Sequence, residues 1–233
     1  MTTASAQERS RSVQGMFSQI ADRYEFMNHV MTGWQDIRWR VDVIRRAGLQ
    51  PGSRLLDLGA GTGDLSREAL RQQPDVLPLA ADFTLAMMQA GKKRTTTTVQ
   101  WSAADALQLP FPDNSFDAIV SGFLLRNVTD LQQALSEQLR VLKPGGTWVS
   151  LDTTRPERNI FYPFVHLYLR WGIPLLGWLL TGQRKAYTYL PATTERFLRA
   201  EELAVRLAIV GYQRIGFQRR NFGTVAIHWA SKA

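Results

Sequence analysis

Residues 59–64, Gly-Ala-Gly-Thr-Gly-Asp, form a glycine-rich segment directly after a short apolar run. Glycines in this position let the backbone turn sharply from a strand into a helix and approach a ligand closely, because a Cβ would collide there. The segment therefore predicts a loop that holds a nucleotide or a nucleoside. The candidate ligand contacts are the loop residues together with the acid that precedes them: Asp57, Gly59, Gly61, Thr62 and Gly63.

An acidic residue stands at the end of the next apolar run. Asp82 follows Gly63 by about twenty residues, where a carboxylate can accept two hydrogen bonds from the hydroxyls of a ribose. Phe83 comes directly after Asp82 and belongs to the same predicted site. A glycine-rich loop alone is weak support, but here the loop, the spacing and the strand context agree on a nucleoside ligand.

The charge of the loop separates two kinds of nucleoside ligand. In a G-x-G-x-x-G pattern counted from Gly59, the last position is Asp64, whose carboxylate would repel the pyrophosphate of a dinucleotide. A phosphate-free ligand with a cationic sulfonium matches the nearby carboxylates better. The sequence thus favours S-adenosylmethionine as the cofactor, and a class I methyltransferase. A role for Asp64 in capping the following helix is compatible with this interpretation.

A second carboxylate is expected near the adenine. Asp105 and Ala106 follow the third predicted strand. A parallel sheet collects its ligand at the carboxyl ends of its strands, so a carboxylate and a neighbouring backbone amide there can recognise an adenine edge. The alternative is that Asp105 is an ordinary turn aspartate.

The elements around these residues alternate between strand and helix. This alternation predicts an α/β fold with a Rossmann-like, doubly wound, mostly parallel seven-stranded sheet. A Lys-Pro-Gly-Gly turn, residues 143–146, is expected before the fifth strand. The expected strands are 54–58, 77–81, one ending before Asp105, 116–121, 147–152, 212–219 and 225–230, and the expected helices are 64–72, 84–93, 131–142 and 200–210.

The chain divides into a short flexible tail, residues 1–14, and a single methyltransferase domain, residues 15–233. The domain begins with an N-terminal helical cap, residues 15–48, because apolar residues recur there at three- and four-residue spacings. An apolar helical insertion, about residues 155–195, interrupts the later alternation. Its apolar run contains prolines, glycines, His166 and Arg170, so a bent pair of helices is expected rather than a transmembrane span.

Composition limits the classes of function. The 233 residues carry a net charge of +8 and contain no cysteine, which excludes disulfides, thiolate nucleophiles and cysteine-ligated metals. No metal is expected at the site. The N-terminus lacks the apolar stretch of a secretory signal, so the cytoplasm is the expected compartment. Positive charge suits polyanions, but scattered Lys and Arg residues argue against nucleic acid. RNA methylation remains a weaker alternative.

Several segments are specific enough to indicate a family. The chain resembles the ubiquinone/menaquinone biosynthesis C-methyltransferases from about Met16 to its C-terminus. The glycine loop and the Lys-Pro-Gly-Gly turn occur in methyltransferases generally, whereas the Asp-Arg-Tyr and Leu-Arg-Asn-Val segments discriminate better. The resemblance rests on residues 17–24 with Met27 and Asn28, 55–65, 109–117, 125–130 and 140–146.

The resemblance implies methyl transfer from S-adenosylmethionine to a ring carbon of a prenylated quinol, such as demethylmenaquinol or a methoxy-polyprenyl benzoquinol. A further cofactor contact in the fourth strand falls on Gly122, where a serine is common in the family, so only a backbone contact remains. Residues 151–156 and 183–187 depart from the family pattern and leave the quinol open. The other cofactor contacts that the resemblance implies are Thr62, Asp82, Asp105 and Ala106.

Methylation of a ring carbon requires an electron-rich carbon aligned with the sulfonium methyl, so orientation and dehydration should dominate catalysis. Our hypothesis is that Arg126 and Asn127 hold the quinol oxygen and that Tyr24 closes the pocket. A water, Asp152 or His166 then receives the proton. The alternatives are a structural salt bridge for Arg126, a core position for Tyr24 and a packed histidine at 166.

The apolar insertion favours a lid that dips into anionic lipid and admits a prenyl tail, flanked by Arg155, Arg158, Arg184 and Lys185. This predicts transient peripheral contact at the inner face of the cell membrane. A homodimer interface is the alternative. Two other functions also remain open: methylation of another phenolic or lipid small molecule, and a non-catalytic accessory protein that binds S-adenosylmethionine.

Overall fold

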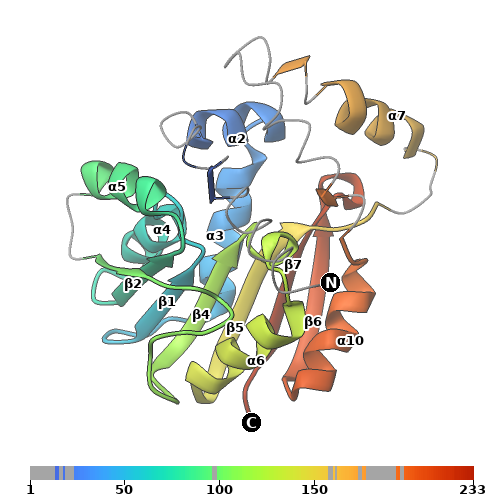
Figure 1. Cartoon of the computed structure of the whole chain (residues 1–233). Helices are drawn as coiled ribbons and strands as arrows, with labels where there is room; N and C mark the ends of the chain where they lie inside the picture. The colour runs from blue at the N-terminus through green and yellow to red at the C-terminus, as the bar shows by residue number, and fades with distance from the viewer. Residues whose placement is uncertain are drawn as a thin grey trace.

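Seven strands form one sheet in the order β3-β2-β1-β4-β5-β7-β6 (Figure 1). The pairs β1–β2, β1–β4, β2–β3 and β4–β5 are parallel, whereas β7 runs antiparallel to both β5 and β6. The predicted doubly wound, mostly parallel seven-stranded sheet is confirmed. The strands are β1 Arg54–Leu58, β2 Leu77–Asp82, β3 Gln100–Ala103, β4 Phe116–Gly122, β5 Leu142–Thr153, β6 Gln213–Arg220 and β7 Val225–Ser231.

The computed structural model describes residues 14–15, 18, 24–95, 99–156, 160, 162–172, 175–176, 193–194 and 197–233. The predicted tail, apart from Gln14, lies outside these residues, as does much of the predicted insertion. The described helices are α2 Tyr24–Thr32, α3 Gln35–Ala47, α4 Asp64–Gln72, α5 Leu85–Arg94, α6 Leu131–Val141, α7 Tyr162–Leu167 and α10 Ala200–Val210, with short helical turns η1 Leu125–Asn127, η2 Tyr168–Gly172 and η3 Asn221–Gly223.

Apolar side chains cover both faces of the sheet, which is why the parallel strands read as continuous apolar runs. In β1, Leu55, Leu56 and Leu58 are all buried. On one face they pack with α3 and α4, and on the other they meet the cluster that includes α6 and α10. This two-sided burial leaves ligand access at the carboxyl ends of the strands, where Figure 1 shows α2 lying above the sheet.

Two local features differ from the expected elements. β5 begins at Leu142 and includes residues 143–146, because its pairing with β4 shifts register between Phe116 and Ala118 and Gly145 adopts a φ of +75°. The expected turn is therefore an irregularity inside the strand. In the cap, Gly33 and Trp34 both have positive φ, so α2 and α3 are two separate helices.

The described part of the apolar insertion is helical. α7 continues into η2, a single π-helical segment, and Tyr168 Oη donates to the Met31 carbonyl of α2 at 2.7 Å. Among the residues that the structure describes, no helix combines the length and apolar character needed to cross a bilayer.

Candidate active site

A cavity of about 580 Å³ opens where β1, β2, β3 and β4 end. This volume lies in the usual range for small-molecule sites. Gly63 does not line the cavity, and a Cβ added there would lie 2.8 Å from Trp101 Cη2, so its role is to let the loop pack on that ring. The other nine predicted cofactor residues all line it: Asp57, Gly59, Gly61, Thr62, Asp82, Phe83, Asp105, Ala106 and Gly122.

Two glycines of the loop, Gly59 and Gly61, lie close to neighbouring side chains. Gly59 and Gly61 both have positive φ, at +68° and +57°. A Cβ at Gly59 would lie 2.9 Å from Leu124 Cδ1, and one at Gly61 would lie 3.2 Å from Met87 Cε. Larger residues would be strained at both positions.

The Asp82 carboxylate is held by backbone donors. The Gly61 N–H donates to Oδ2 and the Thr84 N–H donates to Oδ1, both at 2.7 Å. Burial raises the pKa of Asp82, and these hydrogen bonds oppose that rise. A carboxylate has about four acceptor positions, so two backbone contacts leave it able to accept from a ligand as well.

Asp57 is buried beneath the loop. The N–H and the hydroxyl of Ser66 both donate to Oδ2, at 3.0 and 2.8 Å. Oδ1 has no hydrogen-bond partner among the described residues. Burial raises the pKa of Asp57 to about 7. Because Asp57 lines the cavity, a cationic group of a ligand there would interact favourably with its ionised carboxylate.

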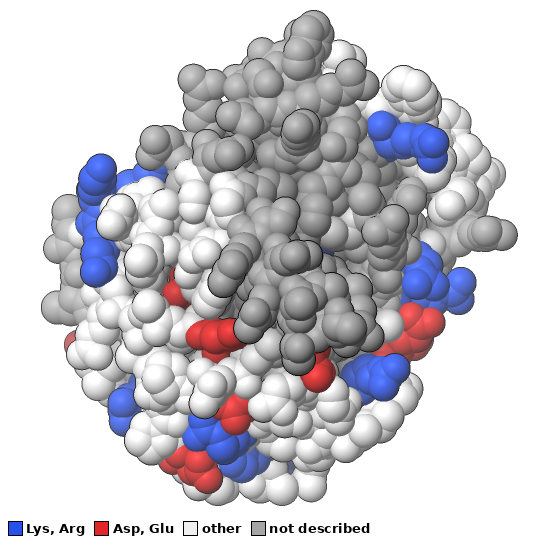
Figure 2. Space-filling view, in the orientation of Figure 1, with Lys and Arg blue, Asp and Glu red and all other residues white. Residues whose placement is uncertain are grey.

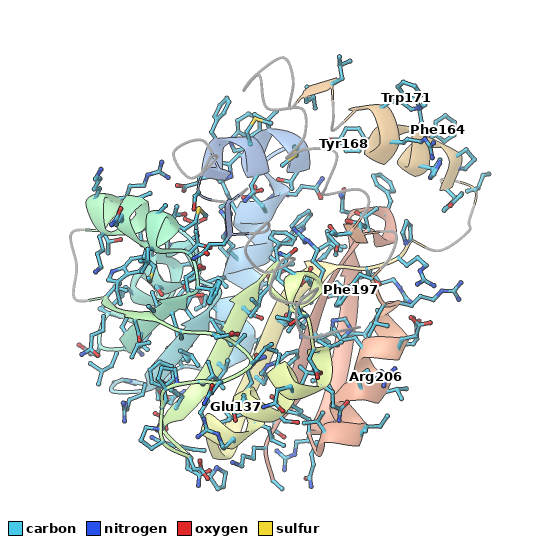
Figure 3. The ribbon with its side chains drawn as sticks, viewed as in Figure 1. Glu137, Phe164, Tyr168, Trp171, Phe197 and Arg206 are labelled. Atoms are coloured by element: carbon cyan, nitrogen blue, oxygen red, sulfur yellow. The ribbon has the colours of Figure 1, made fainter. Side chains whose placement is uncertain are left out.

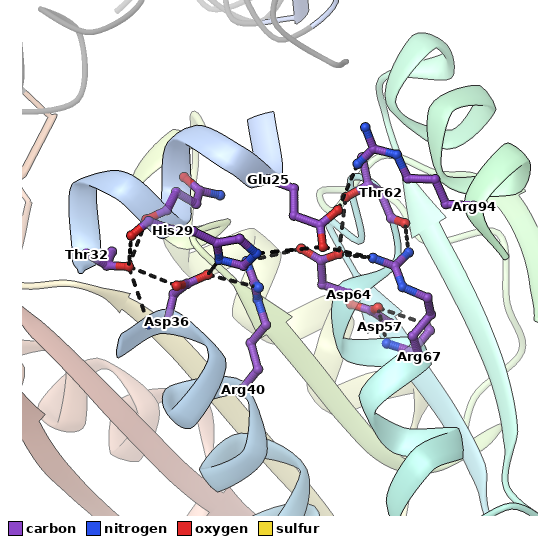
Figure 4. A network of polar contacts seen from close by, with 12 residues as sticks. Glu25, His29, Thr32, Asp36, Arg40, Asp57, Thr62, Asp64, Arg67 and Arg94 are labelled. Atoms are coloured by element: carbon purple, nitrogen blue, oxygen red, sulfur yellow. Dashed lines mark hydrogen bonds and ion pairs between the residues drawn. The ribbon is translucent and has the colours of Figure 1, made fainter. Parts of the chain in front are cut away.

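Asp64 is held at the start of α4 by two arginines (Figure 4). Arg40 Nη2 lies 3.0 Å from Asp64 Oδ2, and Arg67 Nη2 contacts Oδ1. Arg67 also donates to the carbonyl of Thr62 at 2.7 Å. Gly63 is the N-cap residue and Asp64 is the first residue of the helix, so Asp64 does not hold the cap position and its observed role is ion pairing beside the loop.

The residues expected to contact the adenine, Asp105 and Ala106, line the cavity together with Gly122. Asp105 Oδ1 accepts from the Leu107 N–H at 2.9 Å, as a turn aspartate does, while the residue also lines the cavity. The turn role and the ligand role are therefore compatible. A Cβ at Gly122 would meet only Leu65 Cδ1 at 3.5 Å, an ordinary contact, so the absence of a serine there is not imposed by packing.

Arg126 and Asp152 form a buried ion pair. Arg126 Nη1 lies 3.0 Å from Asp152 Oδ1, and the backbone N–H groups of Arg126 and Thr153 also donate to this carboxylate. Burial raises the pKa of Asp152 and the Arg126 charge opposes that rise. Neither residue is part of the cavity lining, whereas their neighbour Asn127 is. The next side chain of the same turn therefore faces the cavity.

The profile of the ubiE/COQ5 methyltransferase family matches residues 2–232. The chain belongs to this family. The ubiquinone/menaquinone biosynthesis C-methyltransferase UbiE of Desulfotalea psychrophila is 44% identical over 221 residues, covering 94% of this chain and 90% of that protein. The demethylmenaquinone methyltransferase of Roseiflexus castenholzii is 38% identical over 226 residues, covering 97% and 95%. The resemblance inferred from the sequence motifs is confirmed.

Solved structures support the fold. The [4+2]-cyclase SpnF is 20% identical with a TM-score of 0.70, covering 96% of both chains. Haemonchus contortus phosphoethanolamine N-methyltransferase 2, in complex with S-adenosyl-L-methionine, is 16% identical with a TM-score of 0.65, covering 93% of this chain and 60% of that one. Because a cyclase shares the fold, the fold alone does not assign methyl transfer, and the family does.

As a family member, the chain is an S-adenosylmethionine-dependent methyltransferase. The cavity fits this cofactor, because its described lining brings together four carboxylates that suit a cationic ligand, including the buried Asp57. The tight backbone at Gly59 and Gly61 supplies the close approach that a nucleoside needs.

The remaining predicted catalytic residues lie on the helical layer above the sheet. Tyr24 is the first residue of α2, and its side chain falls outside the described part of the chain. His166 lies on α7, where its ring stacks on Tyr162 with centroids 5.8 Å apart.

Residues of the cap were missed by the sequence reasoning. Asn28 and Arg40 both line the cavity, and the Asn28 side-chain nitrogen is buried without a hydrogen-bond partner among the described residues. Asn28 is only 8% exposed. Asn28 belongs to the segments that carry the family resemblance, and that was the available signal. The sequence does not show that its helix lies over the loop, so the contact of Asn28 with the cavity could not be predicted.

We expect cofactor binding to depend on the protonation of Asp57. The pKa of Asp57 is about 7, so its carboxyl group is mostly protonated at pH 6 and mostly ionised at pH 8. A cationic ligand binds the ionised form better, so this change of pH should lower the dissociation constant of S-adenosylmethionine by roughly tenfold, about 1.4 kcal/mol. Asp57→Asn should bind more weakly and lose this pH dependence. Calorimetry in buffers with different ionisation enthalpies measures both the affinity and the proton released.

The same proton affects stability in the absence of ligand. The pKa of Asp57 is raised from 3.8 to about 7, so the native state holds a proton that the unfolded chain has lost. Its contribution to the free energy of unfolding is present below pH 3.8 and is lost as the pH rises through about 7. A wild-type affinity for S-adenosylmethionine that does not change between pH 6 and 8 would contradict the predicted role of Asp57 in binding.

Proposed function

We propose that the chain transfers a methyl group from S-adenosylmethionine to a ring carbon of a prenylated quinol in respiratory quinone biosynthesis. The candidate acceptors are demethylmenaquinol and a methoxy-polyprenyl benzoquinol, the chemistry for which its relatives are named. The observation that carries the proposal is the composition of one cavity. Its carboxylates suit the cofactor, and an apolar wall of Phe123, Leu124 and Val128 suits a ring.

The cofactor supplies an electrophilic methyl group, and the protein's contribution is to place and dehydrate the acceptor ring. Asn127 lines the cavity beside the apolar wall, and its side-chain nitrogen donates to the Phe123 carbonyl at 2.9 Å. In our proposal Asn127 contacts the quinol oxygen and Tyr24 closes the pocket. The ring hydrogen leaves as a proton to a water.

Arg126 acts in this proposal as a positioning residue rather than a direct quinol ligand. Its ion pair with Asp152 fixes η1, the turn that presents Asn127 to the cavity. The Asp152 carboxylate already accepts from Arg126 and from two backbone N–H groups, so it is a poor site for the ring proton. His166 belongs in our proposal to the α7 surface and not to proton transfer.

The exposed face of α7 and η2 supports a proposed contact with a membrane. Phe164 is 72% exposed and Trp171 is 66% exposed, and Figure 3 shows both on the outer side of this segment. Ile160, Leu167 and Leu175 are also exposed and continue the same helical spacing. We propose that this stripe, which we call the apolar face, enters the interfacial region of a bilayer.

Charge supports lipid as the occupant of the apolar face. Residues 160–177 contain no Asp or Glu, and Arg170 is exposed beside the apolar side chains. A basic helix with an apolar face binds anionic lipid. The acceptor's polyprenyl tail is itself a membrane component, so this face would bring the cavity to its substrate. A second copy of this chain is the competing occupant.

The basic side chains give no reason to propose a nucleic-acid partner. On the face shown in Figure 2, Lys and Arg side chains lie in separate groups with acidic side chains among them. Several arginines are engaged in ion pairs, including Arg71 with Glu68 and Arg140 with Glu137. A nucleic-acid surface would instead present a continuous basic stripe.

The acceptor is tested by methyl transfer from labelled S-adenosylmethionine to demethylmenaquinol and to the methoxy-benzoquinol, each with a short prenyl tail, in detergent. We expect a C-methylated product from at least one of them and none from a simple catechol. Asp82→Ala should abolish transfer because the ribose contact is lost. Cofactor binding by the wild type with no product from either quinol would overturn the proposed acceptor.

The role of Arg126 is tested by removing one charge and then both. Arg126→Met leaves the Asp152 carboxylate buried and unpaired, which should cost about 3–5 kcal/mol of stability and raise the KM for the quinol as Asn127 shifts. The double change Arg126→Met with Asp152→Asn should recover most of the stability and lower that KM again. Chemical denaturation and steady-state kinetics measure the two effects.

Cofactor affinity serves as the control for this pair, and S-adenosylhomocysteine should bind all three proteins within about twofold of one another. If the double variant folds and binds cofactor but kcat stays low with KM unchanged, Arg126 acts directly on the reacting ring and the positioning role is wrong.

The apolar face is tested with vesicles. Phe164→Ser with Trp171→Ser should reduce sedimentation with phosphatidylglycerol vesicles at least about tenfold, because burial of each such side chain contributes roughly 1.5–3 kcal/mol. The matched control is Val205→Ser with Ile209→Ser on α10, whose side chains are 58% and 61% exposed. Equal binding by both variants, or loss of a dimer without any vesicle binding, would contradict the membrane contact.

A further inference from the structure

The charges around the cavity are unbalanced for the cofactor that this family uses. S-adenosylmethionine carries a sulfonium, an ammonium and one carboxylate. The described lining of the cavity has four acidic residues and a single basic one, Arg40. A ligand carboxylate placed among these acids would be disfavoured unless a cation met it. The acidic lining residues are Asp57, Asp64, Asp82 and Asp105.

Arg40 lines the cavity beside the glycine-rich loop. It lies on α3, its side chain is 12% exposed, and Nη2 is 3.0 Å from Asp64 Oδ2 beside the glycine-rich loop. Asp82 is the last residue of β2 and Asp105 follows β3. The residues expected to contact the nucleoside are therefore different from Arg40.

The guanidinium of Arg40 is held in place by a second carboxylate, that of Asp36. Arg40 Nη1 lies 2.9 Å from Oδ2 of Asp36, a fully buried carboxylate one turn earlier on α3. His29 Nδ1 lies 2.8 Å from the same Asp36 oxygen, and the Thr32 hydroxyl donates to the other at 2.9 Å. Figure 4 shows this chain of contacts running from α2 to the loop.

These contacts leave Arg40 able to bind one more anion. A guanidinium has five N–H donors in a rigid fork. The ion pairs with Asp36 and Asp64 use one contact at Nη1 and one at Nη2, so other N–H donors remain for a ligand. The planar fork suits a carboxylate and forms charge-assisted hydrogen bonds that are stronger than neutral ones.

We propose that Arg40 binds the carboxylate of the amino-acid end of S-adenosylmethionine, and that Asp36 is the residue that positions it. The inference rests on the cofactor of the family and not on the acceptor. It assigns the cap, and not only the loop, a direct part in cofactor binding, because Arg40, Asp36 and the residues that contact Asp36 belong to α2 and α3.

The test compares ligands that differ in the carboxylate. Wild type, Arg40→Met and the control Arg38→Met, an exposed arginine on the same helix, are titrated with S-adenosylhomocysteine, its decarboxylated form and 5′-methylthioadenosine. Arg40→Met should weaken S-adenosylhomocysteine by roughly 10- to 150-fold, as expected for loss of a hydrogen bond to a charged group. Its affinity for the two ligands without a carboxylate should stay within about twofold of wild type, and Arg40→Lys should recover part of the loss.

Two results would overturn the proposal. Equal weakening of all three ligands by Arg40→Met would show that Arg40 only shapes the cavity, and unchanged binding of S-adenosylhomocysteine would place its carboxylate elsewhere. If Arg40→Met does not fold, Arg40→Met with Asp36→Asn is compared with Asp36→Asn alone, because that background removes the buried unpaired charge. None of these titrations requires a quinol, so a wrong acceptor leaves their outcome unaffected.

Discussion

The mutual repulsion of carboxylates is the constraint on which this site depends. Asp57, Asp64, Asp82 and Asp105 line one cavity, and like charges in a partly dehydrated space raise the free energy of the folded state. They are stabilised in three ways. Backbone N–H groups hold Asp82 and Asp105, burial favours a proton on Asp57, and arginine pairs with Asp64. A cationic ligand relieves the remaining repulsion, so the same arrangement that strains the ligand-free protein selects a sulfonium over a pyrophosphate.

The ion pairs of Asp64 also help to fix the position of the helical cap. Its two arginines come from different elements, α3 and α4, and Arg67 in addition contacts Glu25 of α2 and the Thr62 carbonyl. The loop, the first helix after it and the cap are therefore joined through a few charged groups. This explains why the cap closes over the ligand end of the sheet although it precedes the sheet in sequence.

The cofactor half of the site could be predicted because βαβ units fix their own geometry. Once β1 and β2 are recognised, the positions of Gly59, Gly61 and Asp82 at adjacent strand ends follow from spacing alone. The pairing of Arg126 with Asp152 could not be read in this way, since 26 residues separate them and only the neighbouring strands β4 and β5 bring them together. Both residues were expected near the reaction in separate roles, and no feature of the sequence indicates that their opposite charges pair with each other. The cap network was missed for the same reason, because its partners belong to separate elements.

The proposed membrane contact and the cofactor site meet in α2. Tyr168 of η2 donates to the Met31 carbonyl near the end of α2, and Glu25 near its start pairs with Arg67 and Arg94. A bilayer that takes up the apolar face would act on α7 and η2, and through Met31 on the helix that lies above the cavity. Since Glu25 is tied to the same arginine that holds the Thr62 carbonyl, a shift of α2 toward the lipid must either break those ion pairs or move the loop. The ion pairs of Glu25 are partly exposed, so breaking them costs less than breaking buried pairs. Under the proposed function the cap would then move for an entering prenyl chain, while the buried contacts of Asp57 and Asp82 hold the cofactor end of the cavity.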